Sequence, residues 1–111
     1  MDTKELIEAT CPECRGPLSQ ICHDDAIYEY TCLVGHAYAA RTLLQAHSDV
    51  QEQALWSAVL ALEESANIVR AVSVELAGDV AERLAIQANL KIQQAAAIRE
   101  ILQRLEPFQT G

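Results

Sequence analysis

Two short segments of the chain, CPECRGPL and YTCLVGHAY, each carry a pair of side chains that bind metal ions. Cys11 and Cys14 form a Cys-x-x-Cys pair, Cys32 and His36 form the second pair, and 17 residues separate Cys14 from Cys32. Zinc takes four nitrogen or sulfur ligands at the corners of a tetrahedron. Two such turns joined by a β-hairpin form a zinc ribbon, so the sequence predicts one Zn²⁺ held by Cys11, Cys14, Cys32 and His36.

The glycines and the remaining cysteine agree with this prediction. Gly16 and Gly35 lie in the two turns, where they are expected to relieve the backbone. Cys22 and His23 are the rival candidates for fourth ligand. Eight extended residues from Cys14 to Cys22 would span about 26 Å, which places Cys22 at the far tip of the hairpin. We therefore expect Cys22 to be a small, half-buried hydrophobic residue.

The predicted zinc ion is structural. A catalytic zinc keeps one coordination position open to water, whereas four protein ligands close the shell here. A ribbon of about 30 residues cannot bury enough apolar surface to fold alone, so metal binding must supply folding free energy. A redox-active Cys-x-x-Cys pair is the alternative, but that motif needs a helix N-terminus within a βαβ unit, which this sequence does not predict.

Composition and motifs limit the function further. The 111 residues suffice for one domain, and half of them are apolar. The net charge of −8 argues against nucleic acid and anionic membranes as partners, because both require clustered Lys and Arg. No phosphate loop, nucleophile motif or helical Glu-x-x-His pair occurs, so we expect no enzymatic activity. Four cysteines without a signal peptide or membrane span predict a cytoplasmic protein.

The predicted fold is mainly α, with a small N-terminal zinc ribbon. Residues 1–10 are expected to form a single helical turn or a loose lead-in. Two short strands, LSQIC and AIYEYT, flank a polar turn and form the ribbon hairpin. A short helix is predicted over 39–46. The expected organisation is a lead-in, a ribbon over 11–38, and a helical region over 39–111 that packs with the ribbon as one unit.

The remainder of the helical region is predicted to be a long antiparallel hairpin. Ser48 begins a capping-box pattern, and the helix that starts there is expected to reach about Ala77. Gly78 suits the C-terminal end of that helix. Asp79 is the expected N-cap of the second helix, and Pro107 is expected to end it.

Apolar residues at alternating spacings of three and four support the hairpin, because such spacing forms a coiled-coil seam. The first helix carries Leu55, Val59, Leu62, Ala66, Val69 and Leu76. The second helix carries Ala81, Leu84, Ala88, Ala95, Ile98, Leu102 and Leu105.

Further apolar residues fall outside this seam: Trp56, Leu60, Ile68, Val72, Ile86, Leu90, Ala97 and Ile101. The short helix, the ribbon or a second copy in a four-helix bundle would cover them, and ordinary exposed apolar residues are the alternative. We predict a protein-contact surface that includes Trp56, Leu60, Ile86, Leu90 and Ile101, with a homodimer as one form of that contact.

The strings CPEC-x-GPL, YTCLVGHAY and ALWSAVLALEE resemble the C-terminal extension of bacterial signalling proteins that carry a chemotaxis-type protein-glutamate methylesterase domain. In that family the second turn reads roughly Arg-Cys-x-Val-Gly-His-Ala-Tyr, and a Leu-Trp pair starts the long helix. Cys32, His36, Leu55 and Trp56 occupy the matching places, and the resemblance covers about residues 11–105.

The methylesterase domain has no counterpart in this sequence. The resemblance therefore implies a non-enzymatic, zinc-stabilised module for protein–protein interaction or regulation in bacterial, chemotaxis-like signalling. Two alternatives stay open: a regulatory fragment of a methylesterase system, and a thiol or metal redox sensor that uses Cys22.

Overall fold

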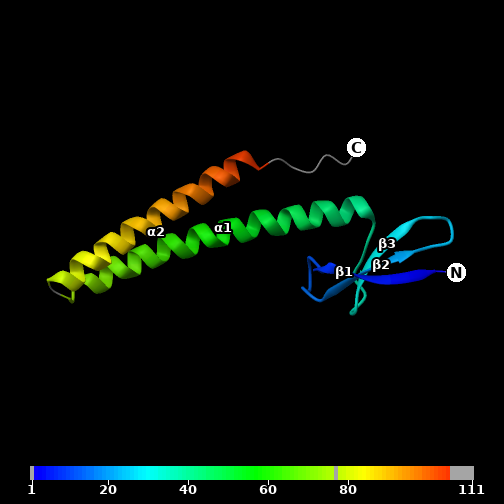
Figure 1. Ribbon diagram of the computed structural model, residues 1–111, viewed down its shortest axis with the longest axis horizontal. Coiled ribbons are helices and arrows are strands. Elements are labelled where there is room, and N and C mark those ends of the chain that lie inside the picture. The colour runs from blue at the N-terminus through cyan, green and yellow to red at the C-terminus, as the bar shows by residue number, and fades with distance from the viewer. Residues whose placement is uncertain (1, 77, 106–111) are drawn as a thin grey trace. The chain divides into compact units, whose positions relative to one another are not determined.

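The computed structural model describes residues 2–76 and 78–105. Its elements follow in the order β1 (Thr3–Thr10), β2 (Pro17–Cys22), β3 (Tyr28–Cys32), β4 (Ala37–Tyr38), α1 (Ala40–Ser73) and α2 (Asp79–Arg104), as Figure 1 shows. The chain divides into two compact units, one that runs to Val50 and one that begins at Gln51. The first turns of α1 thus belong with the sheet, and the rest of α1 belongs with α2.

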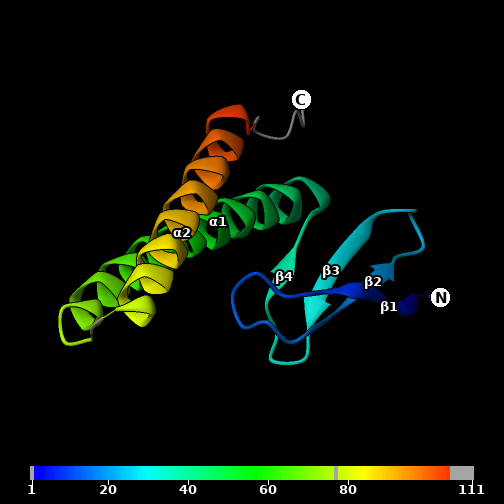
Figure 2. The same cartoon turned by 60° about the vertical axis from the view of Figure 1, so that its left-hand side comes forward.

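The four strands form one antiparallel sheet in the order β1-β2-β3-β4, which can be followed across Figure 2. The β2–β3 hairpin was the part predicted from sequence. The expectation of a helical turn or loose lead-in over residues 1–10 is wrong, because Thr3–Thr10 pairs with β2. Ile7 and Ala9 alternate with exposed residues and pack against the core, as a half-buried strand requires.

The unit that runs to Val50 contains all four strands and is called the sheet unit below; its core is small. Its buried apolar residues are Cys11, Leu18 and Cys32, with Ile7, Ala9, Tyr38 and Leu43 packed against them. Two of the three buried apolar residues are therefore predicted metal ligands. So little buried apolar surface contributes only a few kcal/mol at about 25 cal/mol per Å², which leaves the unit dependent on a further source of stability.

Helix α1 is continuous through Ser48, so the predicted short helix over 39–46 and the separate start at Ser48 are wrong. No proline or glycine interrupts the segment, and Gln45 bonds Asp49 one turn later at 3.0 Å across the expected break. Helix propagation through such a segment outweighs the weak local preference of Ser48 for a cap.

The turn between the helices also differs in detail from the prediction. Helix α1 ends at Ser73 rather than near Ala77, which lies outside the described residues. Gly78 has the expected positive φ of 68°, but it is itself the N-cap of α2. Asp79 lies in the first turn, where its carboxylate still suits the positive end of the helix dipole. The role predicted for Pro107 also lies outside the described residues.

The helical hairpin is confirmed, and its seam is mostly the predicted one. Val59 and Ala66 are buried on α1, and Ala88 and Ala95 are buried on α2. The outermost seam residues are not covered: Leu76 and Leu105 are each 42% exposed. The described part of the chain contains no helix that is long and apolar enough to span a membrane.

The five residues of the predicted contact surface are all exposed, with relative solvent accessibilities of 42% to 68%: Trp56, Leu60, Ile86, Leu90 and Ile101. They belong to the unit that begins at Gln51, and they lie outside its buried seam residues. What they contact stays a prediction.

Candidate metal centre

The two turns bring four donor atoms together. The sulfurs of Cys11, Cys14 and Cys32 and a ring nitrogen of His36 all lie within 4.8 Å of one another. The His36 Nδ1 atom is 3.3 Å from Cys32 Sγ and 3.6 Å from Cys11 Sγ. Tetrahedral bonds of about 2.3 Å to sulfur and about 2.0 Å to nitrogen imply donor separations of about 3.5 to 3.8 Å. The cluster therefore fits a single tetrahedral metal ion.

All four predicted ligands are in this cluster. Neither Cys22 nor His23 belongs to it, as the geometric argument from the strand length predicted. Cys22 is half-buried at the end of β2, also as predicted. His23 instead lies between two carboxylates, with Nδ1 at 3.1 Å from Asp2 Oδ2 and Nε2 at 3.1 Å from Glu29 Oε2.

The first turn is closed by backbone hydrogen bonds. The amide of Cys11 donates to Gly16 O at 2.7 Å, and the amide of Arg15 donates to Cys11 O at 2.9 Å. The left-handed residue is Arg15, with φ of 64°, rather than the expected Gly16. Gly16 contributes space instead, because a Cβ at that position would lie 3.4 Å from Cys14 Sγ.

The second turn follows the prediction. Gly35 has φ of 104°, a conformation that side-chain-bearing residues rarely adopt, and its amide donates to Cys32 O at 3.3 Å. The amide of His36 donates to Cys32 Sγ at 3.3 Å, which favours the thiolate form of that sulfur. The turn thus places both ligands of the pair and prepares one of them for metal binding.

Two residues that sequence reasoning missed contact the ligands. Glu13 Oε2 is 3.1 Å from His36 Nε2, while the other ring nitrogen of His36 faces the sulfurs. A carboxylate on the outer nitrogen fixes the tautomer and orientation of a metal-binding imidazole. The hydroxyl of Tyr38 lies 3.5 Å from Cys11 Sγ and can donate to a thiolate there. The position of Glu13 inside the Cys-Pro-Glu-Cys turn was the available signal.

The surroundings of the buried thiols favour their ionised forms. Burial raises the pKa of Cys11, but hydrogen bonds from backbone amides, including that of Cys14, and from the Tyr38 hydroxyl outweigh it and lower that pKa to about 6. Burial likewise opposes ionisation of Cys32, and the amides of His36 and Val34 lower its pKa. Thiolates are the form that binds metal ions, so both sulfurs suit the role of ligand.

Replacing Glu13 tests its role beside His36. We expect Glu13→Ala to weaken zinc affinity about 10- to 100-fold, because His36 loses the carboxylate that orients it. Competition with a chromophoric chelator measures this affinity. Glu8→Ala, which removes an exposed carboxylate of β1, is the matched control and should bind like the wild type. Equal affinities for Glu13→Ala and Glu8→Ala would show that Glu13 does not support the site.

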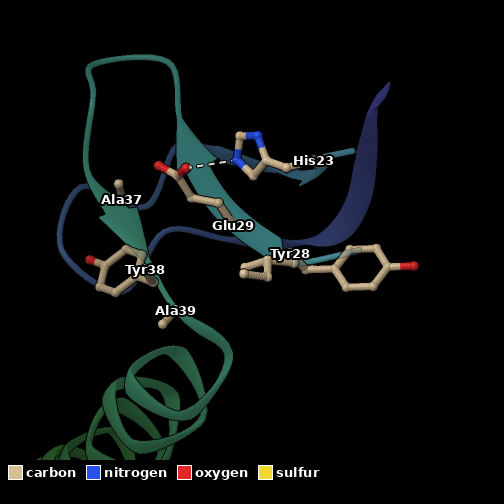
Figure 3. Close-up of a pocket in the computed structure, with 7 residues that line it drawn as sticks. His23, Tyr28, Glu29, Ala37, Tyr38 and Ala39 are labelled. Carbon is tan, nitrogen blue, oxygen red and sulfur yellow. Dashed lines mark hydrogen bonds and ion pairs between the residues drawn. The ribbon is translucent and has the colours of Figure 1, made fainter. Parts of the chain in front are cut away.

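A pocket of about 310 Å³ lies on the sheet unit, and Figure 3 shows the side chains around it. Its lining includes His23, Glu29 and Tyr38, with the His23 ring directed toward the Glu29 carboxylate. The second carboxylate on His23, from Asp2, lies just before β1. His23 therefore links the start of β1 to β3 through paired charges.

The contribution of His23 should depend on pH. Hydrogen bonds to Glu29 and then to Asp2 raise the pKa of His23 above its usual value of about 6.5. Its stabilising effect is therefore complete below about pH 6.5 and disappears as the pH rises through the raised pKa. We expect His23→Gln to lower the thermal midpoint of the sheet unit more at about pH 6 than at about pH 8.5.

The control for this experiment is Lys4→Gln, which removes an exposed charge of β1 that does not titrate between these pH values. Its effect should be the same at both. A loss of stability in His23→Gln that is equal at the two pH values would contradict the role of the imidazolium.

A scan of family models, a search of curated proteins and a search of solved structures each gave no match to this chain. The resemblance to the extension of methylesterase-containing signalling proteins therefore stays a prediction.

Proposed function

We propose that this chain is a non-enzymatic module in which a structural zinc ion stabilises the four-stranded unit and the helical hairpin contacts another protein. The convergence of four donor atoms within 4.8 Å carries the proposal. A shell of four protein ligands leaves no position for a water molecule or substrate, so the bound ion would contribute folding free energy rather than catalysis.

The donor set supports zinc as the metal. Three thiolates and one imidazole are soft to borderline ligands, and a tetrahedral arrangement of sulfur and nitrogen donors is typical of zinc. The small core supports a structural role, because Cys11 and Cys32 are buried with Leu18 as their only fully apolar buried companion among the described residues. The metal would thus hold together a unit that cannot bury enough surface by itself.

The contact role rests on the apolar surface of the hairpin. Leu60, Ile86 and Leu90 are each more than half exposed although the hairpin has a seam of its own. Exposed apolar side chains in excess of the fold's own core are a feature of protein-contact surfaces. A role in bacterial signalling rests on the sequence resemblance alone. The thiol-sensor alternative also stays a prediction, and Cys22 is not a member of the ligand cluster.

Elemental analysis of protein purified without added metal tests the zinc site. We expect about one zinc ion per chain in the wild type and a clear loss in Cys14→Ser, which removes one of the four donors. A zinc content near zero in the wild type, with all four cysteines free or oxidised, would contradict the proposal.

Chemical cross-linking inside the producing cells tests the contact role. The double variant Leu60→Lys/Leu90→Lys should lose cross-links that the wild type forms, because it adds charge to exposed positions on both helices of the hairpin. Circular dichroism would establish that the variant keeps its helices. Identical cross-linked species in both proteins would contradict a contact surface on the hairpin.

A further inference from the structure

The two sides of the helical hairpin differ in charge. Within the described residues, the polar contacts between α1 and α2 include Arg99 to Glu63 at 2.9 Å and the Arg99 guanidinium over the Trp56 ring at 5.5 Å. Trp56, Glu63 and Arg99 each follow a seam residue by one position. They therefore lie on the same side of the seam, which is the charged side of the hairpin.

The other side of α1 carries no charge over five turns. At about 100° per residue, six residues fall within an arc of about 80° that faces away from Trp56 and Glu63. They are Ala54, Ala58, Ala61, Ser65, Ile68 and Val72. None of them is fully buried, and Ile68 is 63% exposed.

On α2, an arc of about 80° directed away from Arg99 carries five uncharged residues: Gln87, Leu90, Gln94, Ala97 and Ile101. All five are exposed, Leu90 at 51% and Ile101 at 50%. Asp79 and Arg83 continue this arc toward the start of the helix, and the half-buried Lys91 lies beside it toward the seam. The seam residues Ala88 and Ala95 lie between this arc and Arg99 around the helix, so the arc is not part of the hairpin's own core.

These two arcs lie on the same side of the hairpin. Each helix has two flanks, one on either side of the seam. In an antiparallel helix pair, a flank of one helix lies beside the same flank of the other helix along the whole seam. The contact between Glu63 and Arg99 shows that the charged flanks of the two helices lie beside each other. The two opposite flanks, which carry the arcs, therefore also lie beside each other. We name the six residues of α1 and the five residues of α2 given above the uncharged face.

The uncharged face is large enough for a specific contact. The 19 residues from Ala54 to Val72 span about 27 Å, and two helices side by side are about 18 Å wide, which gives about 500 Å². Two such faces would bury about 1,000 Å² together, the lower limit for a specific protein interface.

We propose that the uncharged face binds a second copy of this chain and that the two hairpins form a four-helix bundle. Identical chains of net charge −8 repel each other, so their association is favoured at a surface that carries no acidic residues. The uncharged face meets this condition. A basic partner would instead be attracted by acidic residues, and the face contains none.

Side-chain size favours the same occupant. The α1 part of the face has small residues at Ala54, Ala58 and Ala61, and the α2 part has bulky ones at Leu90 and Ile101. Small residues let a neighbouring helix approach closely, so α1 of one copy can receive α2 of the other. This inference rests on the proposed function, since it names the partner of the same hairpin. It also separates the predicted contact residues: Leu90 and Ile101 lie on the face, whereas Trp56 and Leu60 do not.

Analytical ultracentrifugation of the purified zinc-loaded chain, from about 1 to about 100 µM, tests the proposal. Leu90→Lys is compared with Leu60→Lys, because the two leucines are 51% and 54% exposed but only Leu90 lies on the uncharged face. We expect the wild type and Leu60→Lys to form dimers, and Leu90→Lys to raise the dimer Kd at least about tenfold with unchanged helix content.

A wild type that is monomeric throughout this range would overturn the inference, as would equal dimerisation of the two variants. Such a result leaves the proposed function to its own tests. Zinc content does not depend on dimerisation, and cross-links to other proteins in cells would persist when the purified chain is a monomer. Failure of both cross-linking and zinc analysis would instead contradict the proposed function.

Discussion

Replacement of Cys11 by serine is expected to unfold the four-stranded unit while the helical hairpin keeps its structure. Cys11 is a member of the ligand cluster and is fully buried in the core with Leu18 and Cys32. A structural zinc site contributes about 10 to 16 kcal/mol, as much as the total stability of a typical domain. The hairpin has separate buried residues, including Val59 and Ala88, so its seam does not depend on the metal.

Hydrogen exchange read by mass spectrometry distinguishes the two units. In Cys11→Ser, amides of β1 to β3 should lose protection, and amides of α2 should keep it. A chelator should have the same effect on the wild type. Cys22→Ser is the matched control, because it removes a half-buried thiol that is outside the cluster. Protection of the strands in Cys11→Ser equal to that in Cys22→Ser would contradict the structural role of the metal.

Replacement of Val59 by aspartate is expected to unfold the helical hairpin. Val59 is fully buried in the seam, where an isolated carboxylate would cost several kcal/mol or would have to take up a proton. Leu60→Asp is the control at the adjacent position. Because Leu60 is 54% exposed, its change to aspartate should cost less than about 1 kcal/mol.

Thermal denaturation followed by far-ultraviolet circular dichroism measures this difference. Val59→Asp should lose most helical signal at temperatures where Leu60→Asp keeps it. Its zinc content should stay near that of the wild type, since the ligand cluster belongs to the other unit. Similar melting of the two variants would show that the seam is not the core of the hairpin.

The cluster of four donor residues could be predicted from sequence because each pair is local. A tight turn fixes the relation between Cys11 and Cys14, and another fixes Cys32 and His36, so only the β2–β3 hairpin had to be inferred to bring the pairs together. The seam was predictable for the same kind of reason, since spacing along one helix determines which residues share a face. The exposure of the seam's ends was not predictable from spacing, because Leu76 and Leu105 lie beyond the region where the helices cover each other.

Features that depend on distant partners were missed. The strand Thr3–Thr10 carries charged residues at most of its exposed positions, so the alternation of Ile7, Ala9 and Cys11 was too short to identify it before β2 was present as a neighbour. His47 Nε2 donates a hydrogen bond to Thr10 O at 2.9 Å, a contact between residues far apart in sequence. No local pattern indicates such a contact, or the one between Glu13 and His36.

The buried apolar core of the sheet unit consists mainly of proposed metal ligands, which would constrain how the unit diverges between species. A large apolar core constrains many positions weakly, because hydrophobic residues of similar volume replace one another. Here Cys11, Leu18 and Cys32 are the buried apolar residues, so constraint would concentrate on them and on the remaining ligands. Most other strand positions are exposed or only partly buried and are therefore freer to change. Relatives of this unit would therefore be recognised by the spacing of their ligands, even where little overall sequence similarity survives.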